Sequence, residues 1–139
     1  MTAWRDGGGP GSWLGALGLQ VDHVGADAVL AHLDVSEVHH TPFGVVHGGV
    51  LSTLVEWVCS LGASASLNSP DMIVVGTHNS TDFLRPISHG RLDARATPVF
   101  VGRVQQLWSV DITDHQDGRL IAQGRLRLQN VARQRFAEN

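Results

Sequence analysis

The chain contains one long, almost uncharged segment, and the single charge within it is Glu56. From Gly48 to Pro70 apolar side chains recur every three or four positions, at Leu51, Leu54, Val55, Val58, Leu61 and Ala65. This spacing predicts a helix over about Gly49 to Leu67 with one apolar face. Burying a lone carboxylate there would cost several kcal/mol in desolvation. Glu56 is therefore either exposed to solvent or retained for chemistry.

The rest of the chain alternates in the manner of β-strands. Strands are predicted over residues 19–24, 28–35, 73–83, 91–100, 104–113 and 120–129. Asp117-Gly118 supplies the residues that a tight hairpin turn needs. A sheet with one apolar face has to cover it, and only one helix is long enough to do so. The sequence predicts an α+β domain, an antiparallel sheet wrapped around one long central helix.

Length and composition narrow the class of protein. The 139 residues fit one domain, expected over 12–131 with a flexible N-terminal tail at 1–11 and a C-terminal tail at 132–139. A charged share of only 17% favours an oligomer, and a net charge of −3 argues against a nucleic-acid-binding face. No apolar run reaches the roughly 18 residues of a membrane span. One cysteine excludes an intrachain disulfide and fits a cytoplasmic location. No histidine spacing predicts a metal site.

One motif carries a resemblance to a known family. His47-Gly48-Gly49 is followed by Glu56 and Ser60, and then by the predicted strands. This pattern resembles the hotdog-fold acyl-CoA thioesterases, nearest the 4-hydroxybenzoyl-CoA, 1,4-dihydroxy-2-naphthoyl-CoA and phenylacetate-pathway types. The similarity runs from about Leu33 to Val131. It includes the run from Pro42 to Gly49, Val74-Val75-Gly76, Gly102 and Gln106-Leu107-Trp108.

The resemblance implies hydrolysis of a CoA thioester with an aromatic or hydrophobic acyl group, without a further cofactor. Glu56 would be the nucleophile or the general base, and the Gly48 N–H would polarise the carbonyl oxygen. Ser60 would help to place the water or the carboxylate, and His47 would hold the loop or the substrate. A helix N-terminus suits a developing oxyanion, and residues four apart share a helix face.

The resemblance also implies where coenzyme A binds and how the subunits assemble. The matching positions are Gly76, Phe83, Leu84, Arg85, Pro86, Phe100, Val101, Gly102, Arg103, Val104 and Gln105. The two arginines suit phosphates because a guanidinium pairs well with them. The active sites would lie at the interface of a homodimer at least, with a homotetramer expected.

The sequence departs from the family pattern six residues before His47, where the glutamate-using relatives carry Gln and this chain carries Thr41. His39 and His40 are candidates for supplying the missing hydrogen bond.

Plainer interpretations of the same residues stay open. His47 could cap the helix, Ser60 could be a small packing residue, and Arg85 and Arg103 could be surface charges. Cys59 is expected in the core. Two other functions are also open: a non-catalytic acyl-CoA-binding hotdog protein, and a hotdog hydratase or dehydratase. Against the hydratase or dehydratase, this sequence lacks the His-Phe-Pro-Gly type of loop that such enzymes carry.

Overall fold

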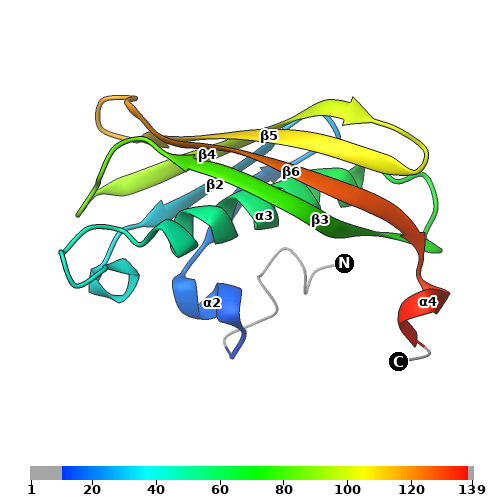
Figure 1. The fold of residues 1–139 in the computed structure, drawn as a ribbon, viewed down its shortest axis with the longest axis horizontal. Coiled ribbons are helices and arrows are strands. Elements are labelled where there is room, and N and C mark those ends of the chain that lie inside the picture. The colour runs from blue at the N-terminus through cyan, green and yellow to red at the C-terminus, as the bar shows by residue number, and fades with distance from the viewer. Residues whose placement is uncertain (1–10, 138–139) are drawn as a thin grey trace.

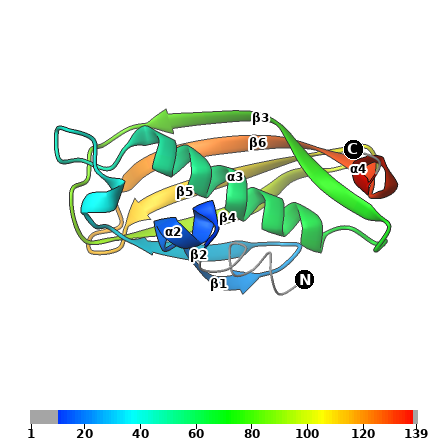
Figure 2. The same cartoon turned by 90° about the horizontal axis from the view of Figure 1, so that it is seen from below.

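A six-stranded antiparallel sheet curls around one long helix in the computed structural model, which describes residues 11–137 (Figure 1). The strands are β1 Gln20–Val24, β2 Val29–Asp34, β3 Met72–Phe83, β4 Arg91–Val101, β5 Gln105–Asp114 and β6 Leu120–Ala132. Their order in the sheet is β1-β2-β4-β5-β6-β3. Helix α3, Gly48–Ala65, connects β2 to β3 and lies along one face of the sheet (Figure 2). The predicted α+β hotdog architecture is confirmed.

Within residues 11–137, three short helices accompany these elements: α2 Trp13–Leu17, the 3-10 helix η1 Glu37–His39 and α4 Gln134–Ala137. The segment 132–139, expected as a tail, therefore holds the last residue of β6 and a short helix. Residues 1–10 of the other expected tail, and residues 138–139, lie outside the described part. No helix within residues 11–137 has the length and apolarity needed to cross a bilayer.

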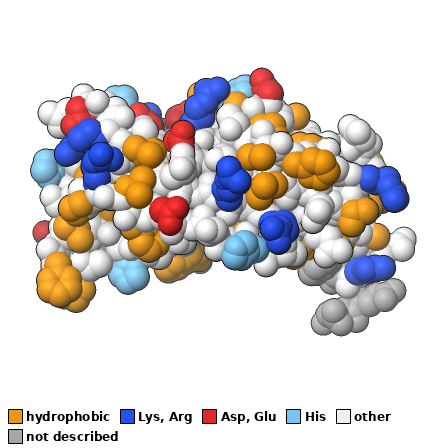
Figure 3. All heavy atoms as spheres, turned by 45° about the horizontal axis from the view of Figure 1, so that its top comes forward, with side chains coloured by type: hydrophobic (Ala, Val, Ile, Leu, Met, Phe, Trp, Pro, Cys, Tyr) orange, Lys and Arg blue, Asp and Glu red, His pale blue; other side chains and the backbone are white. Residues whose placement is uncertain are grey.

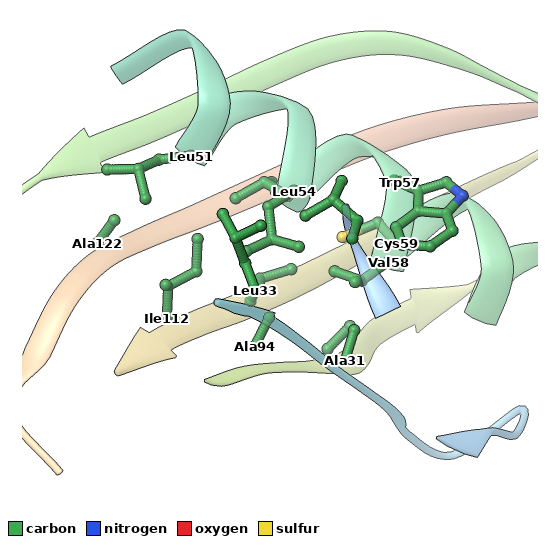
Figure 4. Close-up of a cluster of buried hydrophobic side chains, with 14 of the residues drawn as sticks. Ala31, Leu33, Leu51, Leu54, Trp57, Val58, Cys59, Ala94, Ile112 and Ala122 are labelled. Carbon is green, nitrogen blue, oxygen red and sulfur yellow. The ribbon is translucent and has the colours of Figure 1, made fainter. Parts of the chain in front are cut away.

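The core forms between α3 and the inner face of the sheet. Figure 4 shows side chains from α3 directed at those of β2, β4, β5 and β6. The helix buries Val50, Leu51, Leu54, Val55, Trp57, Val58, Cys59, Leu61, Gly62 and Ala63. This set is broader than the predicted stripe because the curled sheet covers more than one side of the helix. Ala65, predicted to belong to the stripe, is exposed in the last turn.

The helix and the sheet approach each other most closely at Gly62. A Cβ atom there would lie 2.4 Å from Cζ3 of Trp108 on β5, and this tryptophan is completely buried. Only a residue without a side chain fits this position without a shift of its neighbours.

The start of β6 departs from simple alternation. Ile121 is buried together with its neighbour Ala122, although the sequence pattern places these two side chains on opposite faces. The pairing of β5 with β6 shifts at this point, between Ile112 and Thr113. The local irregularity brings both side chains into the core.

Figure 3 shows the molecule from the side of the sheet that faces away from α3. Arg95, Arg125 and Arg127 are exposed residues of β4 and β6. The basic side chains in this view are spread among uncharged ones.

Candidate functional site

The first turn of α3 offers one free backbone donor. His47 is the N-cap residue, and its Nδ1 accepts a hydrogen bond from the Gly49 N–H at 2.9 Å. The Val50 N–H donates to the His47 carbonyl at 2.9 Å. The Gly48 N–H finds no acceptor among residues 11–137. A helix N-terminus leaves such donors unpaired at the positive end of its dipole, so Gly48 can hold an anionic oxygen.

His47 therefore caps the helix, which was the plainer of its two interpretations. Because Nδ1 accepts from a backbone N–H, the neutral ring carries its proton on Nε2. The residue is exposed, and its remaining nitrogen can still reach a ligand.

The Phe83 ring at the end of β3 lies directly over Gly48. A Cβ atom on this glycine would come within 2.6 Å of Phe83 Cε2. The absence of a side chain lets the ring approach the backbone. The structure thus places one predicted catalytic residue beside one predicted substrate-binding residue.

Glu56 lies two turns further along α3, and its side chain is exposed in this chain. Of the two interpretations left open for this residue, the structure agrees with exposure to solvent, because Glu56 faces Gly76 of the edge strand β3 rather than the core. Its Oε1 lies 3.5 Å from where a Gly76 Cβ would be. The pairing of β3 with β6 also shifts between Gly76 and His78. The glycine beside this shift leaves room for the carboxylate, so Glu56 remains exposed to solvent.

Ser60, one turn after Glu56, uses its hydroxyl proton within the helix. Its Oγ donates to the Glu56 backbone carbonyl at 2.7 Å. The side chain therefore bonds the backbone of Glu56 rather than its carboxylate. Only the lone pairs of the Ser60 oxygen remain available to a water molecule or a substrate.

Of the two histidines expected to replace the missing glutamine, His39 has no nitrogen left to do so. His39 accepts from the Ser36 N–H at 2.9 Å through Nδ1 and bonds the Leu17 carbonyl at 2.8 Å through Nε2. Both its nitrogens are taken, so the prediction for His39 is wrong. His40 uses Nε2 to hold the Ser88 carbonyl at 2.8 Å.

Thr41 itself stabilises the turn that precedes the motif. Its Oγ1 accepts from the Phe43 N–H at 3.2 Å, and its carbonyl accepts from the Gly44 N–H at 2.9 Å. The side chain that stands in place of the family glutamine is thus engaged with its own loop.

Apart from Gly76, which lies beside Glu56, the predicted coenzyme A residues fall into two separate segments, 83–86 and 100–105. Along β6, Phe83 is level with Ala122 and Gln105 with Gln129. Seven residues of extended strand separate these levels, roughly 23 Å at about 3.3 Å per residue. Within one chain the two segments do not form a single pocket. Gly102 is half-buried, and all other residues of both segments are exposed.

The two predicted phosphate-binding arginines differ in their surroundings. Arg85 donates from Nη1 to the Leu120 carbonyl at 2.7 Å, which holds it against the β5–β6 turn. The guanidinium of Arg103 has no hydrogen-bond or ion-pair partner among the described residues.

Sequence reasoning missed a polar link between β3 and α3. Asn79 donates from Nδ2 to the Ser52 carbonyl at 2.9 Å, and Thr81 donates to Asn79 Oδ1 at 2.7 Å. The link lies between the Gly48 and Glu56 levels of the helix. The sequence pattern that could have revealed this link is the run of polar residues at alternating positions of β3. No group of three potential ligands for a metal occurs among residues 11–137.

Comparison with known proteins identifies the family. The model described as "Thioesterase superfamily" matches residues 43–121. The chain is 47% identical over 117 residues to "Putative esterase Rv1847" of Mycobacterium tuberculosis, covering 83% of each chain. The solved structure of that protein matches with a TM-score of 0.83 at 45% identity, over 86% of this chain and 96% of that one.

Two further relatives agree. The structure of thioesterase HI1161 from Haemophilus influenzae gives a TM-score of 0.82 at 35% identity, over 88% of this chain and 84% of that one. The 1,4-dihydroxy-2-naphthoyl-CoA hydrolase of Listeria monocytogenes (serotype 1/2a, strain 10403S) is 34% identical over 101 residues, 73% of this chain and 81% of the relative.

The fold and these similarities define a hotdog-fold hydrolase that acts on thioesters. The chain belongs to the thioesterase superfamily, as its motif predicted.

Proposed function

We propose that this enzyme hydrolyses a coenzyme A thioester with an aromatic or hydrophobic acyl group. One water molecule is consumed, and the products are the free carboxylate and the thiol of coenzyme A. The observation that carries the proposal is the exposed Glu56 carboxylate on the same helix whose first N–H, at Gly48, is free. The name of the Listeria relative, a hydrolase of an aromatic CoA thioester, supports the substrate class.

The chemistry follows from these two groups. The Gly48 N–H and the helix dipole stabilise the negative charge that develops on the thioester oxygen. Glu56 either attacks the carbonyl carbon, forming an anhydride that water then hydrolyses, or removes a proton from the attacking water. Both routes need no cofactor beyond the substrate, because a thioester is already reactive.

The spacing along α3 supports a site shared between two subunits. Gly48 and Glu56 are eight residues apart, about 12 Å along the axis at about 1.5 Å per residue and about 80° around it. An oxyanion donor has to lie about 3 Å from the oxygen that it stabilises. One thioester is therefore served by Gly48 of one copy and Glu56 of another. The separation of segments 83–86 and 100–105 supports the same arrangement.

The assembly proposed is a homodimer at least. A homotetramer and a cytoplasmic location stay predictions.

A thiol-release assay with aromatic, short-chain and medium-chain acyl-CoAs tests the activity. The Glu56→Gln variant is expected to lose about 10²-fold to 10⁴-fold in kcat, while its melting temperature and oligomeric state are retained. Glu37→Gln, the same change at an exposed residue of η1, is the matched control. Near-wild-type hydrolysis by Glu56→Gln would contradict the assignment of Glu56 as the catalytic carboxylate. Acyl-CoA binding without thiol release by the wild type would indicate a non-catalytic binding protein.

Rapid quenching separates the two roles of Glu56. A nucleophilic glutamate becomes acylated during a single turnover, which mass spectrometry of the peptide containing it detects. A general base leaves that peptide unmodified at every time point.

A further inference from the structure

One side chain, Asn130 of β6, holds the turn between β4 and β5. Its Nδ2 donates to the carbonyls of Gly102 at 3.0 Å and Arg103 at 3.2 Å. Its backbone N–H donates to the Val104 carbonyl at 2.8 Å. Three consecutive carbonyls of this turn, residues 102–104, are thus bound by a single residue. The Gly102 N–H closes the turn on the Gln105 carbonyl at 2.9 Å.

The orientation of Asn130 is set by Gln106, a β5 side chain that is only 1% exposed. Gln106 Oε1 accepts from Trp108 Nε1 at 2.9 Å, and it shares the single Ser66 hydroxyl proton, at 3.0 Å, with the Ala63 carbonyl, which lies 2.8 Å from Ser66 Oγ. An indole nitrogen can only donate, so the oxygen of the Gln106 amide has to face Trp108. Gln106 Nε2 must then face Asn130 Oδ1, at 3.0 Å. This leaves Asn130 Nδ2 directed at the turn.

The network is fully satisfied. Gln106 Nε2 also donates to the Ala63 carbonyl at 3.2 Å, so both donors of this amide are paired, and its oxygen accepts from the Trp108 N–H. Buried amide networks with every member paired hold one geometry, because any flip leaves a buried group unpaired. The end of α3 is thereby connected through Gln106 and Asn130 to the turn.

The bound carbonyls fix which groups of the turn face outward. All described peptide bonds are trans, so an N–H points opposite to the carbonyl of the same peptide group. The N–H groups of Arg103 and Val104 therefore point away from Asn130. Neither has an acceptor among residues 11–137, and the Arg103 guanidinium beside them has no partner there. Successive outward N–H groups and an unpaired guanidinium on one turn are donors of the kind that bind an anion.

We propose that Asn130 is a positioning residue that sets this turn to bind a phosphate of coenzyme A through the N–H groups of Arg103 and Val104. The inference rests on the proposed function, and it adds the residues that create the phosphate site. It predicts that Asn130 governs recognition of the nucleotide part of the substrate and has no effect on the chemical step.

The test compares one acyl group carried by coenzyme A, by dephospho-coenzyme A and by pantetheine. Asn130→Asp keeps the shape and the oxygen that faces Gln106, but it sets a carboxylate oxygen against two carbonyls. Its kcat/KM for the coenzyme A thioester is expected to fall about tenfold or more, through KM. Its kcat/KM for the pantetheine thioester is expected to stay unchanged. A loss shared by dephospho-coenzyme A assigns the turn to the pyrophosphate, and a loss confined to coenzyme A assigns it to the 3′-phosphate.

Ser66→Ala is the matched control. It removes one hydrogen bond from Gln106 without touching the turn, so it is expected to lower the melting temperature and leave the preference for coenzyme A over pantetheine unchanged. An equal loss on both substrates in Asn130→Asp, or an unchanged preference, would overturn the proposal. Should Asn130→Asp not fold, Asn130→Ala provides the same comparison.

Failure of the proposed thioesterase function can be distinguished from failure of this phosphate-site inference. If the wild type cleaves none of these thioesters, titration calorimetry with coenzyme A itself decides the matter. Weaker binding by Asn130→Asp than by the wild type supports the turn as a phosphate site. Equal binding, or none by the wild type, contradicts it.

Discussion

At the scale of single residues, the proposed chemistry depends on a backbone N–H as much as on a side chain, and this can be tested by removing the N–H alone. Proline is favoured at the first helical position, and His47 has φ −66° and ψ 136°, a conformation that proline accepts in the residue before it. Gly48→Pro and Gly48→Ala both displace the Phe83 ring. Only Gly48→Pro deletes the donor.

We expect Gly48→Pro to lower kcat about 10²-fold to 10³-fold relative to Gly48→Ala, with similar melting temperatures for both variants. Steady-state hydrolysis of an aromatic acyl-CoA is the measurement. Equal kcat values in the two variants would exclude this N–H as the oxyanion donor.

The buried thiol gives a second prediction at this scale. Cys59 has no exposed surface, and burial raises the pKa of its thiol far above the ordinary value, although a hydrogen bond with the Leu126 backbone opposes the shift. Because the thiolate is the reactive form, we expect no labelling by a disulfide reagent at pH 8 until the chain is unfolded. Stoichiometric labelling of the native protein would show that the core opens here.

The sequence was sufficient to identify Glu56, Gly48 and His47 as residues of interest, but it did not indicate their surroundings. Whether Glu56 is buried depends on which strand runs beside α3, and Gly76 is twenty residues away in the chain. His39 shows the same limit, because its partner Leu17 comes from a distant segment.

At the scale of elements, the contact between α3 and β5 depends on Gly62. Exchanging glycine for alanine within a helix normally stabilises it by about 0.5–1 kcal/mol. Gly62→Ala is nevertheless expected to lower the free energy of unfolding by about 1–3 kcal/mol, because the new methyl group meets the buried Trp108 ring. Urea denaturation measures the change. A double-mutant cycle with Trp108→Phe should reduce this cost, and a cost of the same size would place the strain elsewhere.

The β5–β6 turn makes stability depend on acid pH. The Gln116 N–H at 2.9 Å, and Arg119 Nη2 at 3.3 Å, bond the Asp114 carboxylate and hold its pKa below the ordinary 3.8, against the opposing effect of burial. A depressed pKa stabilises the fold above the unfolded-state value, and this stabilisation is lost as pH falls through the folded-state value.

Asp114→Asn should therefore be less stable than the wild type at pH 7, with a difference that shrinks below about pH 4. Urea denaturation at pH 7, 4 and 3 measures the difference. A difference that does not vary with pH would mean that the charge of Asp114 contributes nothing.

Periodicity and turn residues predicted the strands and the long helix to within a few residues. They did not predict the link from Gln106 to Asn130, because these residues are 24 positions apart and meet only through the register of β5 against β6. The register of β5 against β6 cannot be read from a single sequence.

At the scale of the whole molecule, the proposal requires two chains to build one site, and mixed dimers test it. Glu56→Gln and Gly48→Pro are each expected to be inactive alone. In a mixed dimer, one of the two sites combines an intact Gly48 with an intact Glu56 from the other chain. Co-expression at equal amounts should restore about a quarter of wild-type activity. Mixed dimers that form without regaining activity would place both groups of a site in one chain.

Because Cys59 is enclosed in the core, a cysteine introduced at the surface can be labelled selectively. The chain has no other cysteine and no lysine, so reagents for thiols and for side-chain amines meet no accessible competitor on the folded protein. A Val104→Cys substitution would then carry a single fluorophore at the β4–β5 turn. Its emission would report the arrival of coenzyme A optically, in real time and without any turnover.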